Sequence, residues 1–329
     1  MKCTNRYKIL IPVIMTLLLL GGCKERIDVA DAYDVYDTSD SYGLTQSDSQ
    51  ELPGLLATNL CVGGTENTTP VDGVDATVAQ TAAVFSVDDQ EITYAQNIYQ
   101  KMYPASTTKI LTAYIALKYG KLDDVLTVSD EAISSLMTGS SICGLKPGDQ
   151  LTLDQALYGL MLCSGNDAAN VIAEYISGST DKFAELMNQE AQALGATQSH
   201  FVNPHGLPDD NHYTTAYDLY LIFNAAVKND DFVRYISTKK YSTSYTDADG
   251  AVVDQVWFNT NGYLKGSYEA PENVTVVGGK TGTTDEAGNC LVLYSKSSSE
   301  KPYISIILKG NTKRELYSLM TELLTNYSN

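Results

Sequence analysis

The chain has 329 residues, enough to bury a full hydrophobic core as one large domain or two small ones. Its 22 basic and 40 acidic residues give a formal net charge of −18. That sign is wrong for a nucleic-acid binder or a polybasic membrane-binding protein, whereas neutral or basic extracellular partners are not excluded.

Residues 1–22 are typical of an export signal. Three basic residues precede an apolar run at 9–20, which is too short and wrongly flanked for a membrane-spanning helix. The run ends in Leu20-Gly21-Gly22-Cys23, which resembles the lipobox of bacterial lipoproteins. We expect cleavage at Cys23 and a diacylglycerol on its thiol, which would hold the protein at the outer face of the cytoplasmic membrane. The alternative, an ordinary signal peptide with an incidental cysteine, also predicts export.

Residues 23–76 are predicted to form an acidic, extended tether behind the lipidated cysteine. Asp recurs at every third position from Asp28 to Asp40, so the segment repels itself and buries little apolar surface. An acidic helix face or a calcium-binding run is less favoured, because carboxylates without a glycine-turned loop rarely enclose a cation. Ordered structure is expected to begin near Thr77, which makes 77–329 the folded domain.

The folded domain is predicted to mix strands and helices. Several strands with hairpin-scale gaps, preceded by helices and followed by one more, indicate an α/β (α+β) fold with an antiparallel sheet flanked by helices. The last helix should pack on this sheet rather than on a membrane, because its polar face is acidic. The predicted strands are 83–87, 91–94, 251–258, 274–278, 290–294 and 303–308. The predicted helices are 106–120, 151–162, 167–176, 182–194, 215–226 and 313–327.

A candidate nucleophile opens the first of these helices. Ser106 follows Pro104 at the helix start, and Lys109 lies one turn further on the same face, within reach to take its proton. The pattern Ser-x-x-Lys is weak by itself, because it occurs four times in this chain. An N-terminal serine cap beside a solvated lysine is the simpler interpretation of one isolated copy.

Two further polar elements follow in the chain. Ser164-Gly165-Asn166 interrupts two helical runs and leaves a hydroxyl and an amide on a short loop, although a helix cap would look the same. Lys280-Thr281-Gly282 ends a strand, where a glycine lets the backbone approach a ligand and an ammonium attracts a carboxylate. Alone, this tripeptide could be a polar turn.

Histidine and cysteine spacing gives little support for a metal site. The three histidines, His200, His205 and His212, lack a ligand-like spacing on a helix, so structural hydrogen bonds are favoured over zinc. After Cys3 and Cys23, four scattered cysteines remain, which allow three disulfide pairings or a set of free thiols. These four are Cys61, Cys143, Cys163 and Cys290.

In this order, the three polar elements resemble the motif set of penicillin-recognising serine enzymes. Their surroundings, YPASTTK, LCSGNDAAN, FVNPHGL and GGKTGTTDEAGNC, are similar to those of low-molecular-mass D-alanyl-D-alanine carboxypeptidases. The resemblance runs from about Ala82 to the end of the chain. It implies a β-lactamase/transpeptidase-like fold, in which a helix-flanked antiparallel sheet and an all-helical subdomain enclose a groove, and it implies no cofactor.

The resemblance also implies a role for each residue. Ser106 would be the acylated nucleophile, Lys109 its base, and Ser164 a proton relay to the leaving amine. The backbone N–H groups of Ser106 and Thr283 would form the oxyanion hole. The substrate-binding residues would be Asn166 for the amide, and Lys280, Thr281, Gly282 and Thr283 around the terminal carboxylate.

The role of Lys109 requires a neutral amine. A free lysine has a pKa of about 10.4 and is protonated at neutral pH. Burial at the helix start and the nearby cation Lys280 should both lower the pKa of Lys109, as a serine activated by lysine requires.

The expected substrate is a peptidoglycan stem peptide ending in D-Ala-D-Ala, with β-lactam antibiotics as covalent inhibitors. A serine β-lactamase would need a second base to release penicillin, often a glutamate past the Ser-x-Asn element, and the chain has no Glu between Glu190 and Glu269. A non-catalytic, penicillin-sensing lipoprotein is the third alternative. Many family members continue into a further β domain and a membrane helix, so here we expect Cys23 to provide the anchor instead.

Overall fold

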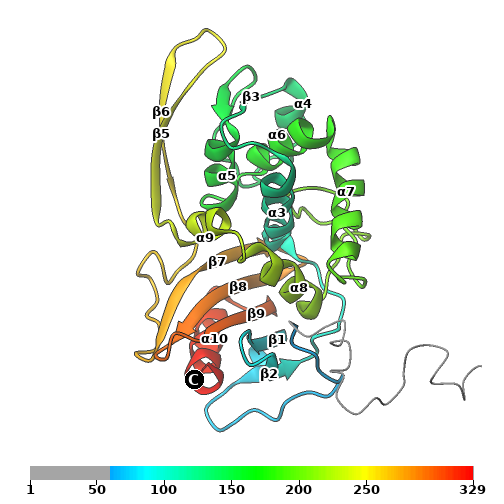
Figure 1. Cartoon of the computed structure of the whole chain (residues 1–329), viewed down its shortest axis with the longest axis vertical. Coiled ribbons are helices and arrows are strands. Elements are labelled where there is room, and N and C mark those ends of the chain that lie inside the picture. The colour runs from blue at the N-terminus through cyan, green and yellow to red at the C-terminus, as the bar shows by residue number, and fades with distance from the viewer. Residues whose placement is uncertain (1–59, 329) are drawn as a thin grey trace, which may run out of the picture. The chain divides into compact units, whose positions relative to one another are not determined.

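The computed structural model describes residues 60–328 (Figure 1). The expected signal peptide at 1–22, Cys23 and the tether up to residue 59 lie outside the described residues. The described residues all belong to one compact unit. In the part of the chain that is described, no helix is long and apolar enough to cross a bilayer.

The main sheet has five antiparallel strands in the order β2-β1-β9-β8-β7. It confirms the predicted antiparallel sheet, and it places β7 at one edge. Its strands are β1 (Ala79–Ser86), β2 (Glu91–Gln96), β7 (Val274–Thr284), β8 (Gly288–Ser297) and β9 (Pro302–Gly310).

Alternation along the strands divides the core between the two faces of this sheet. Ala83 and Phe85 of β1 belong to the core shared with the helical subdomain, whereas Ala82 and Val84 belong to the core beneath α10 (Lys313–Tyr327). The sheet is therefore covered on both sides, as Figure 1 shows, and α10 packs on protein as predicted.

The remaining helices build the all-helical subdomain and its junction with the sheet (Figure 1). Hydroxyl side chains cap several of them: Thr152 and Gln155 form a capping box at α5, and Thr215 caps α8. The helices are η4 (Ala105–Thr108), α3 (Lys109–Tyr119), α4 (Asp130–Ser134), α5 (Leu153–Met161), α6 (Asn166–Ser177), α7 (Thr180–Ala193), α8 (Ala216–Ala226) and α9 (Asp230–Ser237).

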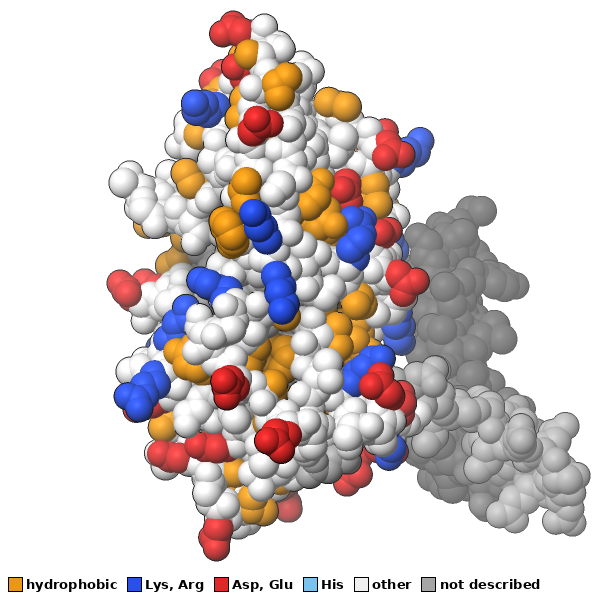
Figure 2. Space-filling view, turned by 90° about the vertical axis from the view of Figure 1, so that its left-hand side faces the viewer, with side chains coloured by type: hydrophobic (Ala, Val, Ile, Leu, Met, Phe, Trp, Pro, Cys, Tyr) orange, Lys and Arg blue, Asp and Glu red, His pale blue; other side chains and the backbone are white. Residues whose placement is uncertain are grey.

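A second sheet, with the order β3-β4-β5-β6, was not foreseen as a sheet. Only its last strand was predicted, because β3 and β4 are three residues each and β5 reads KYSTSYT, with little apolar alternation. Its long hairpin rises beside the helices in Figure 1, and Figure 2 turns that side of the protein towards the viewer. The strands are β3 (Val125–Thr127), β4 (Gln150–Thr152), β5 (Lys240–Thr246) and β6 (Val252–Phe258).

Residues 60–76, expected to be part of the tether, contact the domain. Cys61 is buried and its N–H donates to the Tyr220 hydroxyl, while Thr68 N–H donates to the Ala95 carbonyl on β2. Contacts with the sheet therefore extend N-terminal of the predicted start at Thr77, and the 3-10 turn η3 (Ala76–Val78) leads directly into β1.

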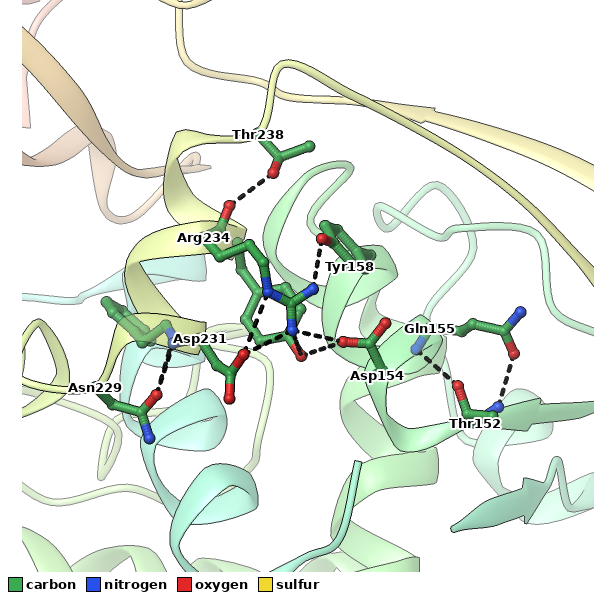
Figure 3. Close-up of polar contacts among 10 residues, drawn as sticks. Thr152, Asp154, Gln155, Tyr158, Asn229, Asp231, Arg234 and Thr238 are labelled. Atoms are coloured by element: carbon green, nitrogen blue, oxygen red, sulfur yellow. Dashed lines mark hydrogen bonds and ion pairs between the residues drawn. The ribbon is translucent and has the colours of Figure 1, made fainter. Parts of the chain in front are cut away.

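An ion-pair network joins α9 to α5 (Figure 3). The Arg234 guanidinium lies 2.9 Å from Asp154 and 2.8 Å from Asp231, and it donates to the Tyr158 hydroxyl at 2.6 Å. The end of α9 in turn packs on β7, where a Cβ added to Gly278 would lie 2.3 Å from the Ile236 carbonyl oxygen. Helix α9 thus contacts both α5 and β7. These two elements lead to the second and the third motif.

Candidate active site

Ser106 lies in the tight turn that opens the first long helix. It is the second residue of η4, and Lys109 starts α3 directly behind it. Ala105 has a φ of 48°, in the left-handed region that a non-glycine residue rarely adopts. Gly206 supports this backbone closely, since a Cβ there would lie 1.8 Å from the Ala105 carbonyl oxygen. Ser106 is partly exposed as a result, and its hydroxyl faces a groove.

The Lys109 amine is buried and arranged as a base. Its Nζ lies 3.1 Å from Ser106 Oγ, as the i, i+3 spacing predicted. It also donates to Asn166 Oδ1 at 2.6 Å and to the His205 carbonyl at 2.7 Å. A neutral amine has two N–H groups and one lone pair, so these two acceptors leave the lone pair for the Ser106 hydroxyl proton.

Burial lowers the pKa of Lys109 well below its ordinary value, and the neighbouring charge of Lys280 lowers it further. Both causes and the direction were predicted from the sequence. The lowered pKa favours the uncharged amine, which is the form that can accept a proton.

Ser164 lies in the break between α5 and α6 that the sequence predicted. Its φ is 62°, so this residue too is held in the left-handed region. The Lys280 amine donates to Ser164 Oγ at 2.9 Å and to the Thr281 carbonyl at 3.0 Å. Ser164 also lines the groove beside Ser106, so its hydroxyl lies between the buried lysine and the space where substrate would bind.

Lys280 lies on edge strand β7 with its amine turned inward. Only 1% of the residue is exposed, and burial lowers its pKa to about 7. Thr281, Gly282 and Thr283 line the groove instead. The sequence placed Lys280 at the substrate carboxylate; in the structure its direct partner is the Ser164 hydroxyl.

Gly282 allows β7 to lie close to Ser106. A Cβ added there would lie 2.9 Å from the Ser106 backbone nitrogen and 3.0 Å from the Ala105 side chain. A larger residue at this position would force β7 and η4 apart, which explains in physical terms why the third motif ends in glycine.

The three motifs thus meet at one groove. Lys109 links the first motif to Asn166, and Lys280 links the third motif to Ser164. One part of the groove is lined by Ser106, Ser164, Thr281, Gly282, Thr283 and Lys313. The other part is lined by Ser106, Asn166, Thr283 and the segments 137–141, 205–208 and 284–286.

Asn166 is shared between the base and the groove. Its side-chain oxygen accepts from Lys109, and its backbone N–H donates to the Ser141 carbonyl. The predicted contact with a substrate amide therefore falls to the rest of its side chain, which lines the groove.

Sequence reasoning missed three residues that shape this site. The Asp167 carboxylate accepts backbone N–H groups of the 143–145 loop and so holds this loop against α6. Thr260 Oγ1 lies 2.7 Å from Thr281 Oγ1. Lys313, the first residue of α10, brings a cation to the groove. Asp167 directly follows the second motif, but nothing in the sequence places Thr260 or Lys313 near the first one.

The histidines make structural hydrogen bonds, as predicted. His212 Nε2 lies 2.8 Å from Thr108 Oγ1, and burial lowers the pKa of His212 to about 4. His200 Nδ1 lies 2.6 Å from the Asn211 carbonyl, and the His205 carbonyl binds Lys109. Within residues 60–328, no group of three or more His, Cys, Asp or Glu side chains could hold a metal ion.

Known proteins are similar to this chain in both sequence and fold. The D-alanyl-D-alanine carboxypeptidase DacF of Bacillus subtilis is 33% identical over 253 residues, which cover 75% of this chain and 61% of that protein. DacA of Escherichia coli K12, a D-alanyl-D-alanine carboxypeptidase, is 32% identical over 265 residues, covering 78% of this chain and 62% of its own length. The chain therefore spans about three fifths of the length of these two relatives.

A solved structure gives the same result. The crystal structure of the Streptomyces K15 DD-transpeptidase matches with a TM-score of 0.70 and 31% identity, over 76% of this chain and 97% of that one. The Peptidase_S11 family, described as D-alanyl-D-alanine carboxypeptidase, matches residues 66–312. This range contains all three motifs and most of both sheets. The chain belongs to the Peptidase_S11 family of D-alanyl-D-alanine carboxypeptidases.

Proposed function

We propose that this protein is a serine-type D-Ala-D-Ala carboxypeptidase, which trims peptidoglycan stem peptides through an acyl-enzyme and is blocked covalently by penicillin. The observation that carries the proposal is the buried amine of Lys109, 3.1 Å from the Ser106 hydroxyl and hydrogen-bonded to two other acceptors. A hydroxyl with a neutral base at this distance is an activated nucleophile.

In the acylation step, Ser106 Oγ attacks the carbonyl carbon of the penultimate D-alanine while Lys109 takes the hydroxyl proton. Negative charge develops on the carbonyl oxygen, and the backbone N–H groups of Ser106 and Thr283 stabilise it. The closeness of β7 to η4 at Gly282 supports this assignment, because both donors then border the same part of the groove.

The tetrahedral intermediate collapses when the leaving D-alanine amine receives a proton. Ser164 gives its own hydroxyl proton to the amine, since this hydroxyl borders the groove and accepts a hydrogen bond from Lys280. Ser164 in turn takes up the proton that Lys109 received from Ser106, so Lys109 is neutral again for the next step. Water then attacks the Ser106 ester, with Lys109 as the base, and the shortened peptide leaves. Thr281, Thr283 and Lys313 hold the terminal carboxylate, and buried Lys280 adds its charge from behind.

We also propose that the protein acts as a lipid-anchored enzyme at the outer face of the cytoplasmic membrane. The support is the sequence pattern Leu-Gly-Gly-Cys ending at Cys23, followed by the acidic segment up to residue 59. This location would bring the groove to nascent peptidoglycan.

The β-lactamase alternative lacks a suitable second base. The acceptors around the Lys109 amine are neutral groups, and no Glu occurs between Glu190 and Glu269. Asp285 and Glu286 line the groove, but both are exposed past the end of β7 and make no hydrogen bond to Ser106 within the described residues. A penicillin adduct on Ser106 should therefore persist.

The proposal is tested by mass spectrometry of the intact protein after benzylpenicillin, beside Ser106→Ala, and by D-alanine release from a synthetic peptide ending in D-Ala-D-Ala. We expect a slowly decaying adduct of one penicillin, its loss in Ser106→Ala, and release of D-alanine. Rapid turnover of penicillin would indicate a β-lactamase, and a stable adduct without D-alanine release would indicate a sensor.

A further inference from the structure

Two thiols lie against the loop that carries Ser164. Cys163 directly precedes this serine, and Cys143 lies in the loop that packs on it. A Cβ added to Gly165 would lie 2.8 Å from Cys143 Sγ, and one added to Gly159 would lie 2.9 Å from the same sulfur. Cys163 Sγ donates to the Gly159 carbonyl at 3.1 Å. Both sulfurs therefore border the same turn of backbone, at Gly159.

The other described cysteines lie elsewhere. Cys61 Sγ donates to the Ser86 carbonyl at 3.2 Å, and Cys290 Sγ lies 3.6 Å from the Ala287 carbonyl oxygen. All four thiols are free in this structure. Of the three pairings that the sequence left open, the one that joins Cys143 to Cys163 brings together two sulfurs that border the same residue, Gly159.

Cys143 and Cys163 take part in the hydrogen bonds that hold the second motif, Ser164-Gly165-Asn166. The Gly159 carbonyl accepts both the Cys163 thiol and the Gly165 N–H, the latter at 3.1 Å. Cys143 Sγ donates at 3.1 Å to Asp167, which also accepts the Cys143 N–H. Between these contacts Ser164 is held at a φ of 62°, so a shift of its neighbour changes the direction of its hydroxyl.

We propose that Cys143 and Cys163 form a reversible disulfide that turns Ser164 away from Lys280 and slows acylation of Ser106. The effect on acylation rests on the function proposed above, whereas the disulfide does not. The export signal predicted at residues 1–22 would bring the pair to a compartment where disulfides form.

The oxidant is a disulfide, either glutathione disulfide or an oxidised thiol-disulfide oxidoreductase. Partly exposed Cys163 attacks one sulfur of the oxidant as a thiolate, forms a mixed disulfide and releases one thiol. Cys143 then attacks the Cys163 sulfur and releases the second thiol, so two electrons pass to the oxidant. Burial raises the pKa of the Cys143 thiol, and this makes the second step the slower one at neutral pH.

The geometry decides which residue moves. A disulfide needs an S–S distance of about 2.05 Å, shorter than any hydrogen-bond contact between thiols. Cys143 Sγ is enclosed by Gly159, Gly165 and Asp167, so Cys163 must turn towards it and leave the Gly159 carbonyl. Ser164 turns with it and loses its 2.9 Å hydrogen bond to Lys280.

The test incubates the full-length protein with increasing ratios of oxidised to reduced glutathione, alkylates the remaining thiols with iodoacetamide, and maps the peptides by mass spectrometry. The rate of acylation by benzylpenicillin is measured on the same samples. We expect a linked Cys143–Cys163 peptide, an acylation rate at least about 10-fold lower in the linked form, and recovery with dithiothreitol.

For each variant, the acylation rate of the oxidised protein is divided by the acylation rate of the same protein after reduction. A general effect of the substitution on acylation therefore cancels. Cys143→Ala and Cys163→Ala should bring this ratio to one, whereas Cys61→Ala should leave it as in the wild type. The proposal is overturned if both thiols remain alkylated at every ratio, or if the linked protein acylates as fast as the reduced one. If the reduced wild type is not acylated at all, the proposed function fails, and the peptide map still decides whether the pair forms.

Discussion

At the scale of single residues, two lysines with lowered pKa values define the site. Both are buried. In the proposed mechanism they have different roles: Lys109 has to be neutral to accept a proton, and Lys280 has to be charged to polarise Ser164 and attract a carboxylate. Burial lowers the pKa of both lysines, and the charge of Lys280 lowers the pKa of Lys109 further.

The pH dependence of kcat/KM follows from these shifts, since it reports groups in the free enzyme. Activity should rise as pH increases through the lowered pKa of Lys109, and fall as pH increases through about 7, where Lys280 loses its proton. For kcat the falling limb should lie higher, because a bound carboxylate stabilises charged Lys280. Rates of D-alanine release from pH 4 to 10 test this, and a profile governed only by a group at the free-lysine value would contradict it.

Lys313 supplies a cation that no motif indicated. Lys313→Met should raise KM for a D-Ala-D-Ala peptide about 10-fold, as expected when a charge-assisted hydrogen bond worth about 1.5 kcal/mol is lost, with a small change in kcat. The matched control is Arg314→Met, because Arg314 is the next residue of α10 but borders a different surface depression. Equal KM values for the two variants would show that Lys313 does not contribute to substrate binding.

At the scale of elements, the distance between β7 and η4 sets the width of the groove beside Ser106. Gly282→Ala places a Cβ 2.9 Å from the Ser106 nitrogen, so the two elements must separate. We expect acylation by benzylpenicillin to slow about 100-fold, the usual cost of a misplacement near 1 Å. Gly64→Ala, whose Cβ meets no atom within 4 Å, is the control and should react normally. An unchanged rate in Gly282→Ala would show that the spacing does not matter.

Helix α9 connects the second and third motifs through Arg234 (Figure 3). Arg234→Met removes the pairs with Asp154 and Asp231, whose partly exposed positions limit the cost to about 1 kcal/mol of unfolding free energy. The exposed i, i+4 pair of Lys296 and Glu300 provides the comparison, and Lys296→Met should cost less than about 0.5 kcal/mol. Urea unfolding measures both, and equal losses would argue against a network contribution.

At the scale of the whole molecule, the proposed lipid anchor would determine where the protein acts. Cys23→Ser in the full-length protein should abolish incorporation of labelled palmitate and move the protein from the membrane fraction to the soluble fraction of cells. The penicillin adduct on Ser106 should form at the same rate in both forms. Retention of the variant in the membrane would contradict anchoring through Cys23.

Much of the fold could be predicted because long periodic segments carry their own signal. The central strands are apolar runs and several helices begin at hydroxyl caps, so β9 and α8 were expected close to their true bounds. Strand β1 was expected at 83–87 and begins four residues earlier, at Ala79. Strand β5 has polar side chains and is held by backbone pairing with β6 across their hairpin, so its side-chain pattern could not reveal it. Helix α9 is held by Asp154 and Tyr158 of α5, which lie more than 70 residues away in the sequence.

By itself, the sequence determined the three motifs and the pairing of Ser106 with Lys109, because one helical turn fixes that distance. Only the tertiary structure decided that Lys280 contacts Ser164 rather than facing the groove, that Lys313 reaches the groove, and that the Cys143 and Cys163 sulfurs both border Gly159. These contacts join segments 20 to more than 100 residues apart, and their geometry depends on how β7, α10 and the loops pack, which no local pattern encodes.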